Sequence, residues 1–281
     1  MDNLLGFNNT GISFYKGLSE PFQSQTLYDR SLDRMNSQEA KARVDSLYQE
    51  LYRHWDEKIN RGRFMTRLRE GRLPLPSVRR FFKDWGLFSI EVVALNAVSY
   101  HVHLPFFVSN YDLLPAFSDK IAEELVSPKP PGHILILLET ANALGLSKQE
   151  LFEQPASPAG RAISDYCRRV FQDGSIAELW ALHTFEETLG HWSKQWADAL
   201  TTHYGLSTRQ AVYFTAHAEA DLIEHEDHMG HGPLNRMILQ RIMEQDLTAT
   251  KLGYDMKYCA VTMVDLQSLM ELNAIENPYP S

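Results

Sequence analysis

One short segment, AHAEADLIEH, combines imidazole and carboxylate side chains at helical spacing. It places His217, Asp221 and His225 at intervals of four residues. Side chains three or four residues apart lie on one face of an α-helix, so these groups would converge. Imidazole together with carboxylate suits a transition metal better than calcium or magnesium. Because Phe214 and Ile223 keep the helix apolar enough for a core, the segment predicts a buried metal site.

A second interpretation of this segment stays open on these residues alone. The chain continues as EHEDHMGH, and a charged, histidine-rich run is also typical of a solvent-exposed helix face. Acidic residues on two other predicted helices favour the metal site.

The first of these acidic residues is Glu124. It shares an apolar helix face with Phe117 and Ile121, whereas Glu123 shares the outward side with Lys120. A carboxylate on an apolar face is unfavourable unless it is paired or bound to a metal. The alternative is a glutamate at the edge of the stripe that reaches water.

The second acidic residue is Glu186, on a longer predicted helix. It lies on a face whose other members are Leu179, Leu182, Leu189 and Trp196. Glu187 is predicted to turn to a wetter side, toward His183 and His191. Glu186 is therefore expected inside the bundle and Glu187 outside it.

A further histidine, His133, directly follows SPKPPG at the start of a predicted helix. Alone it would be interpreted as a hydrogen-bonded core residue, but Glu124 lies only one loop away. The inward-facing set is then three carboxylates and three histidines: Glu124, His133, Glu186, His217, Asp221 and His225. Six such ligands suit two metal ions with one bridging carboxylate, as in di-iron sites inside helical bundles. The Glu-x-x-His motifs of ferritin-like sites do not occur in the sequence.

Helices must position these groups, because the apolar residues repeat with helical periodicity and no alternating strand pattern occurs. We expect an all-α, single-domain bundle of seven or eight helices. The first begins near Ser37 as its cap, and the second, rich in aromatic residues, ends before 104–107. Later helices cover about 113–126, 133–145, 157–173, 175–204 and 206 onward, with one or two more after 233. The boundaries expected are an extended arm at 1–36, the helical domain at 37–273 and a short tail at 274–281.

Composition narrows the classes of function. The 281 residues carry a formal net charge of −9 and are 44% hydrophobic. Duplex binding relies on clustered Lys and Arg, so nucleic acid is not expected as a partner. Cys167 and Cys259 are the only cysteines, which disfavours a disulfide framework or a thiolate zinc site. No uninterrupted apolar run approaches about 18 residues, and no signal peptide is evident, so we expect a cytoplasmic protein without membrane partners.

The order of motifs resembles that of the haem-oxygenase-like di-iron oxidases and oxygenases, which share their fold with the thiaminase-II-like and pyrroloquinoline-quinone-synthase-like proteins. The resemblance covers roughly residues 49–270. It rests on FMTRLREGRLPLPSVRRFFKDW, then AEEL, GH, HTFEE, HYGLS and YFTAHAEADLIEH in that order. HYGLS before YFTAHAEAD is the most distinctive portion.

This resemblance implies ligand positions at Glu124, His133, Glu186, His217 and Asp221, with Glu186 as the bridge. Family members often carry the last histidine three residues after the aspartate, where this chain has Glu224. His225 is therefore the predicted sixth ligand, with Glu224 and His228 as alternatives.

The chemistry implied is activation of dioxygen, as co-substrate, by two Fe²⁺ ions per chain. The substrate is expected to be a small amino- or carboxyl-bearing metabolite, with Arg161, Arg168, Arg169 and Lys194 as possible partners for a carboxylate. N-oxygenation, desaturation and C–C cleavage all fit this chemistry. No electron donor is indicated, and a homodimer is compatible with the chain. Two alternatives stay open: a metal-independent quinone-synthase-like or thiaminase-like enzyme, and a non-catalytic helical interaction protein.

Overall fold

A computed structural model describes residues 35–222 and 229–279 of the chain. Every regular element in these ranges is helical. Residues 1–34 of the predicted arm lie outside these ranges. Glu224, His225 and His228 lie outside them too. In chain order the elements are α2 (Ser37–Trp55), π-helix η2 (Asp56–Asn60), α3 (Arg63–Arg69), α4 (Leu75–Ser109), α5 (Leu114–Val126), α6 (His133–Ala143), α7 (Lys148–Phe152), α8 (Pro158–Asp173), α9 (Ile176–His183), α10 (Phe185–His203), α11 (Val212–Leu222), α12 (His231–Glu244) and α13 (Met256–Glu276).

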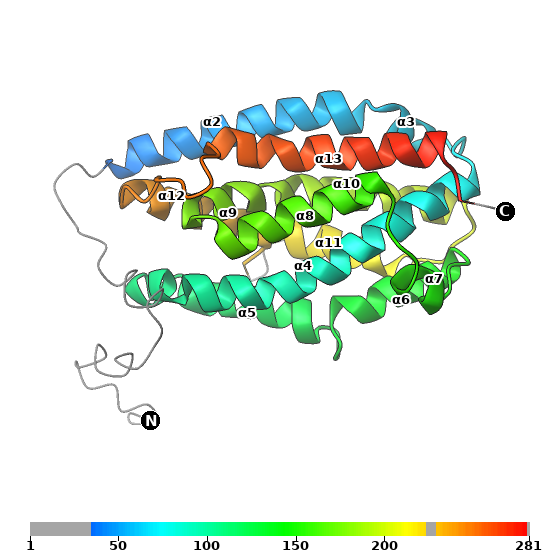
Figure 1. The fold of residues 1–281 in the computed structure, drawn as a ribbon, viewed down its shortest axis with the longest axis horizontal. Coiled ribbons are helices and arrows are strands. Elements are labelled where there is room, and N and C mark those ends of the chain that lie inside the picture. The colour runs from blue at the N-terminus through cyan, green and yellow to red at the C-terminus, as the bar shows by residue number, and fades with distance from the viewer. Residues whose placement is uncertain (1–34, 223–228, 280–281) are drawn as a thin grey trace.

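The long helices run along one another to form an elongated bundle (Figure 1). α13 packs beside α2, α4 packs along α8, and α10 packs along α11. Between them lies an aromatic core in which Trp85, Trp192 and Trp196 are completely buried. The all-α class is thus confirmed, with more helical segments than the seven or eight expected.

The second predicted helix is longer than expected. α4 continues through Leu104–Phe107 to Ser109 and contains Pro105, which removes one backbone hydrogen bond. Burial compensates for this loss, because the ring of Phe107 stacks on that of Phe117 at 3.8 Å. α4 is long and apolar enough by composition to cross a membrane, but the core helix of a water-soluble bundle has the same properties.

The predicted helix at 175–204 is broken at Thr184 into α9 and α10. The Thr184 hydroxyl donates a 2.7 Å hydrogen bond to the carbonyl of Ala181, and such back-bonding bends helices. The break lies two residues before Glu186, which is in the first turn of α10. At the first helix, Asn36 rather than Ser37 is the cap, since its side chain accepts a hydrogen bond from the Glu39 backbone N–H.

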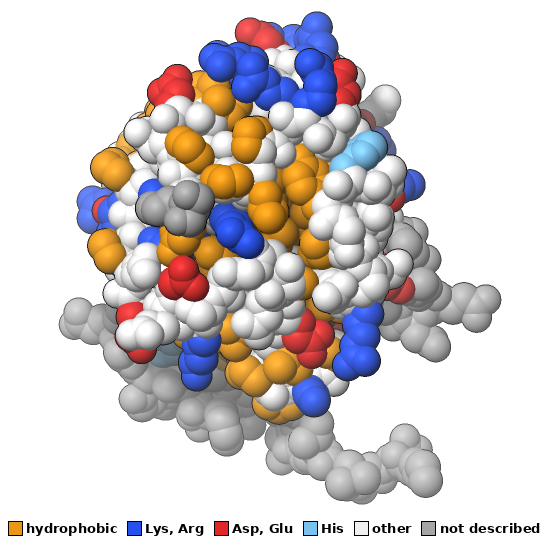
Figure 2. Space-filling view, turned by 90° about the vertical axis from the view of Figure 1, so that its right-hand side faces the viewer, with side chains coloured by type: hydrophobic (Ala, Val, Ile, Leu, Met, Phe, Trp, Pro, Cys, Tyr) orange, Lys and Arg blue, Asp and Glu red, His pale blue; other side chains and the backbone are white. Residues whose placement is uncertain are grey.

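The surface shows no dominance of one charge at the end of the bundle where α13 finishes. In Figure 2, apolar side chains at this end lie between interspersed basic and acidic ones. The acidic and imidazole groups that carry the chemistry instead face the interior of the bundle.

Candidate metal centre

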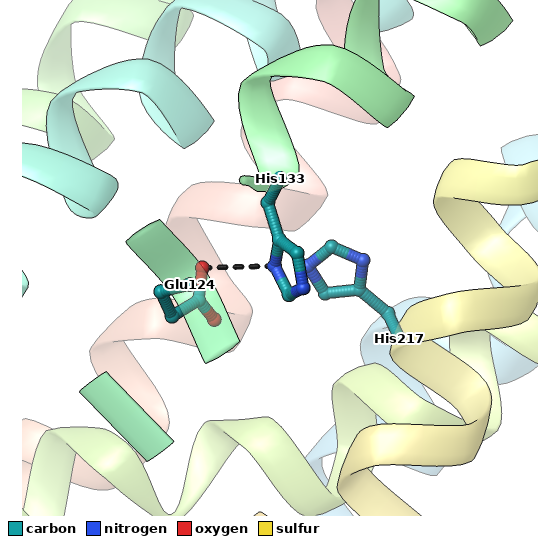
Figure 3. Close-up of side chains that lie close together, drawn as sticks. All are labelled: Glu124, His133 and His217. Carbon is teal, nitrogen blue, oxygen red and sulfur yellow. Dashed lines mark ion pairs between the residues drawn. The ribbon is translucent and has the colours of Figure 1, made fainter. Parts of the chain in front are cut away.

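The first group of converging ligands is Glu124, His133 and His217 (Figure 3). They come from α5, α6 and α11, and one ligand atom from each lies within 4.8 Å of the others. His133 Nδ1 is 2.9 Å from Glu124 Oε2 but lacks hydrogen-bond geometry. This arrangement is expected when two ligand atoms face a common point.

A tight return of the chain places His133 beside Glu124. Gly132, directly before His133, has a φ of +66°, and a Cβ there would lie 2.2 Å from the Glu124 carbonyl oxygen. Only glycine fits this close approach without strain. α6 therefore begins against the last turn of α5, with His133 as its first residue.

His217 has its orientation fixed by a backbone hydrogen bond. Its Nδ1 lies 2.8 Å from the carbonyl oxygen of Tyr213, so Nδ1 donates and the lone pair on Nε2 is free for a metal. This is the usual support for a metal-binding histidine. Burial, together with the neighbouring His133, lowers the pKa of His217 to about 4, which keeps the ring neutral.

The charge on Glu124 is set by the same neighbours. Burial raises the pKa of Glu124, but His133 and His217 more than offset this and bring it to about 2. Burial disfavours charged His133, yet Glu124 raises the pKa of this histidine above its ordinary value. The first group thus offers one carboxylate and two imidazoles, a ligand set suited to ferrous iron.

The second group is Glu186, Asp221 and His231, from α10, α11 and α12. Its ligand atoms also lie within 4.8 Å of one another. Asp221 Oδ1 is 3.1 Å from His231 Nδ1, while Asp221 Oδ2 is buried and accepts no hydrogen bond within the described ranges. An orphaned carboxylate oxygen of this kind fits a metal ligand.

His231 lies between two carboxylates, since its Nε2 is 3.1 Å from Glu123 Oε2. Burial disfavours the charged ring, but hydrogen bonds with Asp221 and Glu123 outweigh it and raise the pKa of His231 to about 10. Glu123 was expected to point outward and instead reaches this histidine, because α12 covers that side of α5.

The two groups repeat one plan. Each combines a glutamate close to a helix end, a histidine that begins a helix directly after glycine, and a residue from α11. The Gly230–His231 pair at the start of α12 parallels Gly132–His133 at the start of α6. This repeated glycine–histidine pair is the sequence signal that would have found His231, which was not predicted.

Five of the six predicted ligands fall into these groups: Glu124, His133 and His217 in the first, Glu186 and Asp221 in the second. The sixth, His225, lies outside the described residues. The prediction that Glu187 turns toward His191 agrees with the electrostatic interaction between them, whereas the prediction that it turns toward His183 was wrong. It is Glu186 Oε1 that lies 2.8 Å from His183 Nδ1, since residues three apart are neighbours on a helix. Glu187 binds Tyr52 and Arg236 instead.

A cavity lies beside both groups. Glu124, His133, Glu186, His217 and Asp221 form its polar end, and the rest of the wall is mostly apolar, with Trp85, Phe88, Val92, Leu137, Phe171 and Met263 among its members. Neutral polar groups on the wall come from Ser89, Asn96 and Tyr213. Asn96 Oδ1 is buried and has no hydrogen-bond partner within the described part of the chain.

The cations considered as partners for a substrate carboxylate lie away from this cavity. Arg161 and Arg168 form ion pairs with Glu91, Arg169 pairs with Asp173, and Lys194 is exposed. No Lys or Arg is among the described residues that line the cavity.

Comparison with known proteins agrees with this geometry. Residues 101–258 match the family model of iron-containing redox enzymes. The chain belongs to this family. A 4-aminobenzoate synthase of Chlamydia pneumoniae is 29% identical over 153 residues, which are 50% of this chain and 68% of that protein.

Solved structures share the fold of this family member. A TenA homologue from Pseudomonas syringae pv. tomato superposes with a TM-score of 0.60 at 13% identity, covering 88% of this chain and 98% of that one. A domain of unknown function with a haem-oxygenase-like fold from Shewanella denitrificans gives 0.60 at 12% identity, with 83% and 92% covered. A TenA homologue from P. horikoshii gives 0.54 at 15% identity, with 83% and 97% covered.

Proposed function

We propose that this protein is a non-haem di-iron oxidase or oxygenase that uses dioxygen to oxidise a small metabolite. The observation that carries the proposal is the presence of two neighbouring buried carboxylate–imidazole groups at the polar end of one cavity. Glu124, His133 and His217 would hold one iron ion, and Glu186, Asp221 and His231 the other. Binding at the second group would release the proton that His231 holds between Asp221 and Glu123. When bound, ferrous iron supplies the electrons and open coordination positions that dioxygen activation requires.

The residues of the chain supply position, charge balance and exclusion of water. Three carboxylates, from Glu124, Glu186 and Asp221, offset most of the charge of two divalent ions. Glu186 is the proposed bridge, since it lines the cavity together with members of both groups. The aromatic wall of Trp85 and Phe88 limits access of water to the polar end.

The substrate is proposed to be a small amino- or carboxyl-bearing molecule with an apolar body. The name of the Chlamydia relative, a 4-aminobenzoate synthase, supports this class. Because no cationic side chain lines the described wall, a polar substituent there would meet the neutral Asn96 amide, whose Oδ1 can accept a hydrogen bond from an N–H or O–H group.

Anaerobic reconstitution with ferrous iron, followed by metal analysis and measurement of oxygen consumption, tests the proposal. Two iron ions per chain and oxygen consumption are expected. Asp221→Ala should remove both the second ion and the activity, whereas Asp198→Ala, at an exposed position on the same helix as Glu186, should retain them. Catalysis that persists without iron would instead support a metal-independent enzyme.

A further inference from the structure

A buried lysine is built into the second ligand group. Lys120 lies on α5 one turn before Glu124, its side chain is only 2% exposed, and its Nζ forms an ion pair with Glu186 Oε2. The same Nζ lies 3.4 Å from Asn235 Oδ1. From helix periodicity Lys120 was expected on the outward side of its helix, but α12 covers that side.

We propose that Lys120 is a resident cation that makes the two metal sites unequal. Metal binds first to Glu124, His133 and His217, and the second ion takes Glu186 Oε2 by displacing the Lys120 ammonium group. This inference rests on the proposed di-iron function and concerns the order in which the sites fill.

The contacts of Glu186 explain the displacement. Its Oε2 accepts hydrogen bonds from Lys120 and, at 2.7 Å, from Asn235 Nδ2, and its Oε1 lies 2.8 Å from His183 Nδ1. Oε2 thus accepts two hydrogen bonds and has no lone pair left for a metal, whereas Oε1 accepts one and keeps a lone pair. An ion that binds Oε2 must therefore displace one of its two donors, and the ammonium group is the one that leaves because two cations at one oxygen repel each other.

The first group has no such competitor. Glu124 faces the imidazoles of His133 and His217, and no Lys or Arg contacts it among the residues that the structure describes. A divalent ion entering there brings charge to a carboxylate without expelling another cation. The first group should therefore bind metal more tightly than the second.

Charge balance explains why the lysine stays in place until a second ion arrives. Glu186 is partly buried, with 18% of its side chain exposed, beside the buried Asp221 and His231, and a largely desolvated carboxylate is unfavourable without a compensating cation. The ammonium group of Lys120 provides that compensation, and a metal ion would take over the same role. The second group is thereby held in position for its ligand.

Anaerobic titration with Co²⁺, followed by calorimetry and visible absorption, tests the order of filling. The wild-type protein should bind two ions in separate phases, with the second phase weaker. Lys120→Met keeps the length of the side chain and removes its charge, so it should strengthen the second phase by about tenfold or more and leave the first phase nearly unchanged. Lys83→Met is the matched control, because Lys83 is equally buried but binds the Pro155 carbonyl.

The outcomes separate this inference from the proposed function. If neither the wild-type protein nor Glu124→Ala binds Co²⁺, the di-iron proposal is wrong. If the wild-type protein binds two ions and Lys120→Met leaves the second phase unchanged or weakens it, only the inference about Lys120 is wrong. If Lys120→Met does not fold, a crystal structure of the wild-type protein with two Co²⁺ ions provides the test. Lys120 Nζ still paired with Glu186 would overturn the inference. Lys120 Nζ displaced from Glu186 would support it.

Discussion

Gly190 on α10 packs directly against Asp221 on α11. A Cβ added at Gly190 would lie 2.9 Å from the Asp221 Cβ and 2.6 Å from the Leu222 Cγ. These atoms are close to the backbone and cannot swing away, so the absence of a side chain at Gly190 allows α11 to bring Asp221 up to Glu186.

Gly190→Ala should therefore push α11 away from α10. We expect a loss of about 1–3 kcal/mol in the free energy of unfolding, as for other overpacked sites, together with weaker binding of the second metal ion. Urea denaturation and Co²⁺ titration would measure both effects. Gly86→Ala is the control, since its Cβ would meet a terminal methyl of Leu151 and leave the ligands in place. Equal metal binding in wild type and Gly190→Ala would contradict the prediction.

Arg236 is expected to hold α12, and with it His231, against the rest of the bundle. It binds Glu187 through two hydrogen bonds of 2.7 and 2.8 Å, and its guanidinium lies 3.6 Å from the centre of the Tyr48 ring. Arg236→Lys cannot make this forked contact, so the free energy of unfolding should fall by about 1–2 kcal/mol.

Arg241→Lys provides the matched comparison on the same helix. Arg241 also forms a forked contact, with Asp112, but that carboxylate is 58% exposed, and exposed ion pairs contribute less than about 1 kcal/mol. Chemical denaturation of both variants would check the difference. Equal losses for the two would show that burial of the Glu187 pair does not matter.

His217→Ala should lower the affinity of the first group for its metal ion by more than about 100-fold, so that this ion is lost. Even residues that only support a metal ligand change metal affinity by about 10–100-fold. His103→Ala is the control, because His103 is also buried but packs against Trp180 away from both groups. It should cost stability through the cavity it leaves, without changing the number of bound Co²⁺ ions. Retention of both ions by His217→Ala would remove this residue from the ligand set.

Glu271 predicts a pH dependence of stability unrelated to the metal centre. Burial raises its pKa to about 8, although hydrogen bonds from Trp192 and Gln267 oppose this. Between its unfolded pKa of about 4.3 and its folded pKa, the carboxyl is neutral in the native state and ionised in the unfolded state. The contribution of Glu271 to the free energy of unfolding is therefore greatest below about pH 4. It falls by about 1.4 kcal/mol per pH unit as the pH rises toward 8.

Glu271→Gln should remove this dependence while keeping an oxygen for Trp192. The variant should gain on wild type as pH rises from about 5 to 8, by up to about 4 kcal/mol, in urea unfolding at a series of pH values. Glu276→Gln, at an exposed position on the same helix, should follow the wild-type curve. Parallel curves for wild type and Glu271→Gln would contradict the assignment.

The sequence by itself determined the helical class and most of the ligand residues. Helical periodicity requires no long-range information, and a carboxylate such as Glu124 or Glu186 on an apolar stripe stands out because its burial is costly without a partner. Five of the predicted ligands accordingly fall into the two groups in space.

Only the tertiary structure decided how these ligands are divided and what else joins them. His231 lies ten residues beyond Asp221 in the chain, and its place depends on where α12 docks. Lys120 and Glu123 are on the outward side of α5 until α12 covers them, and it is Glu186 rather than Glu187 that contacts His183. Local periodicity specifies which face of a helix is apolar, but the packing of one helix on another decides which polar groups become buried together.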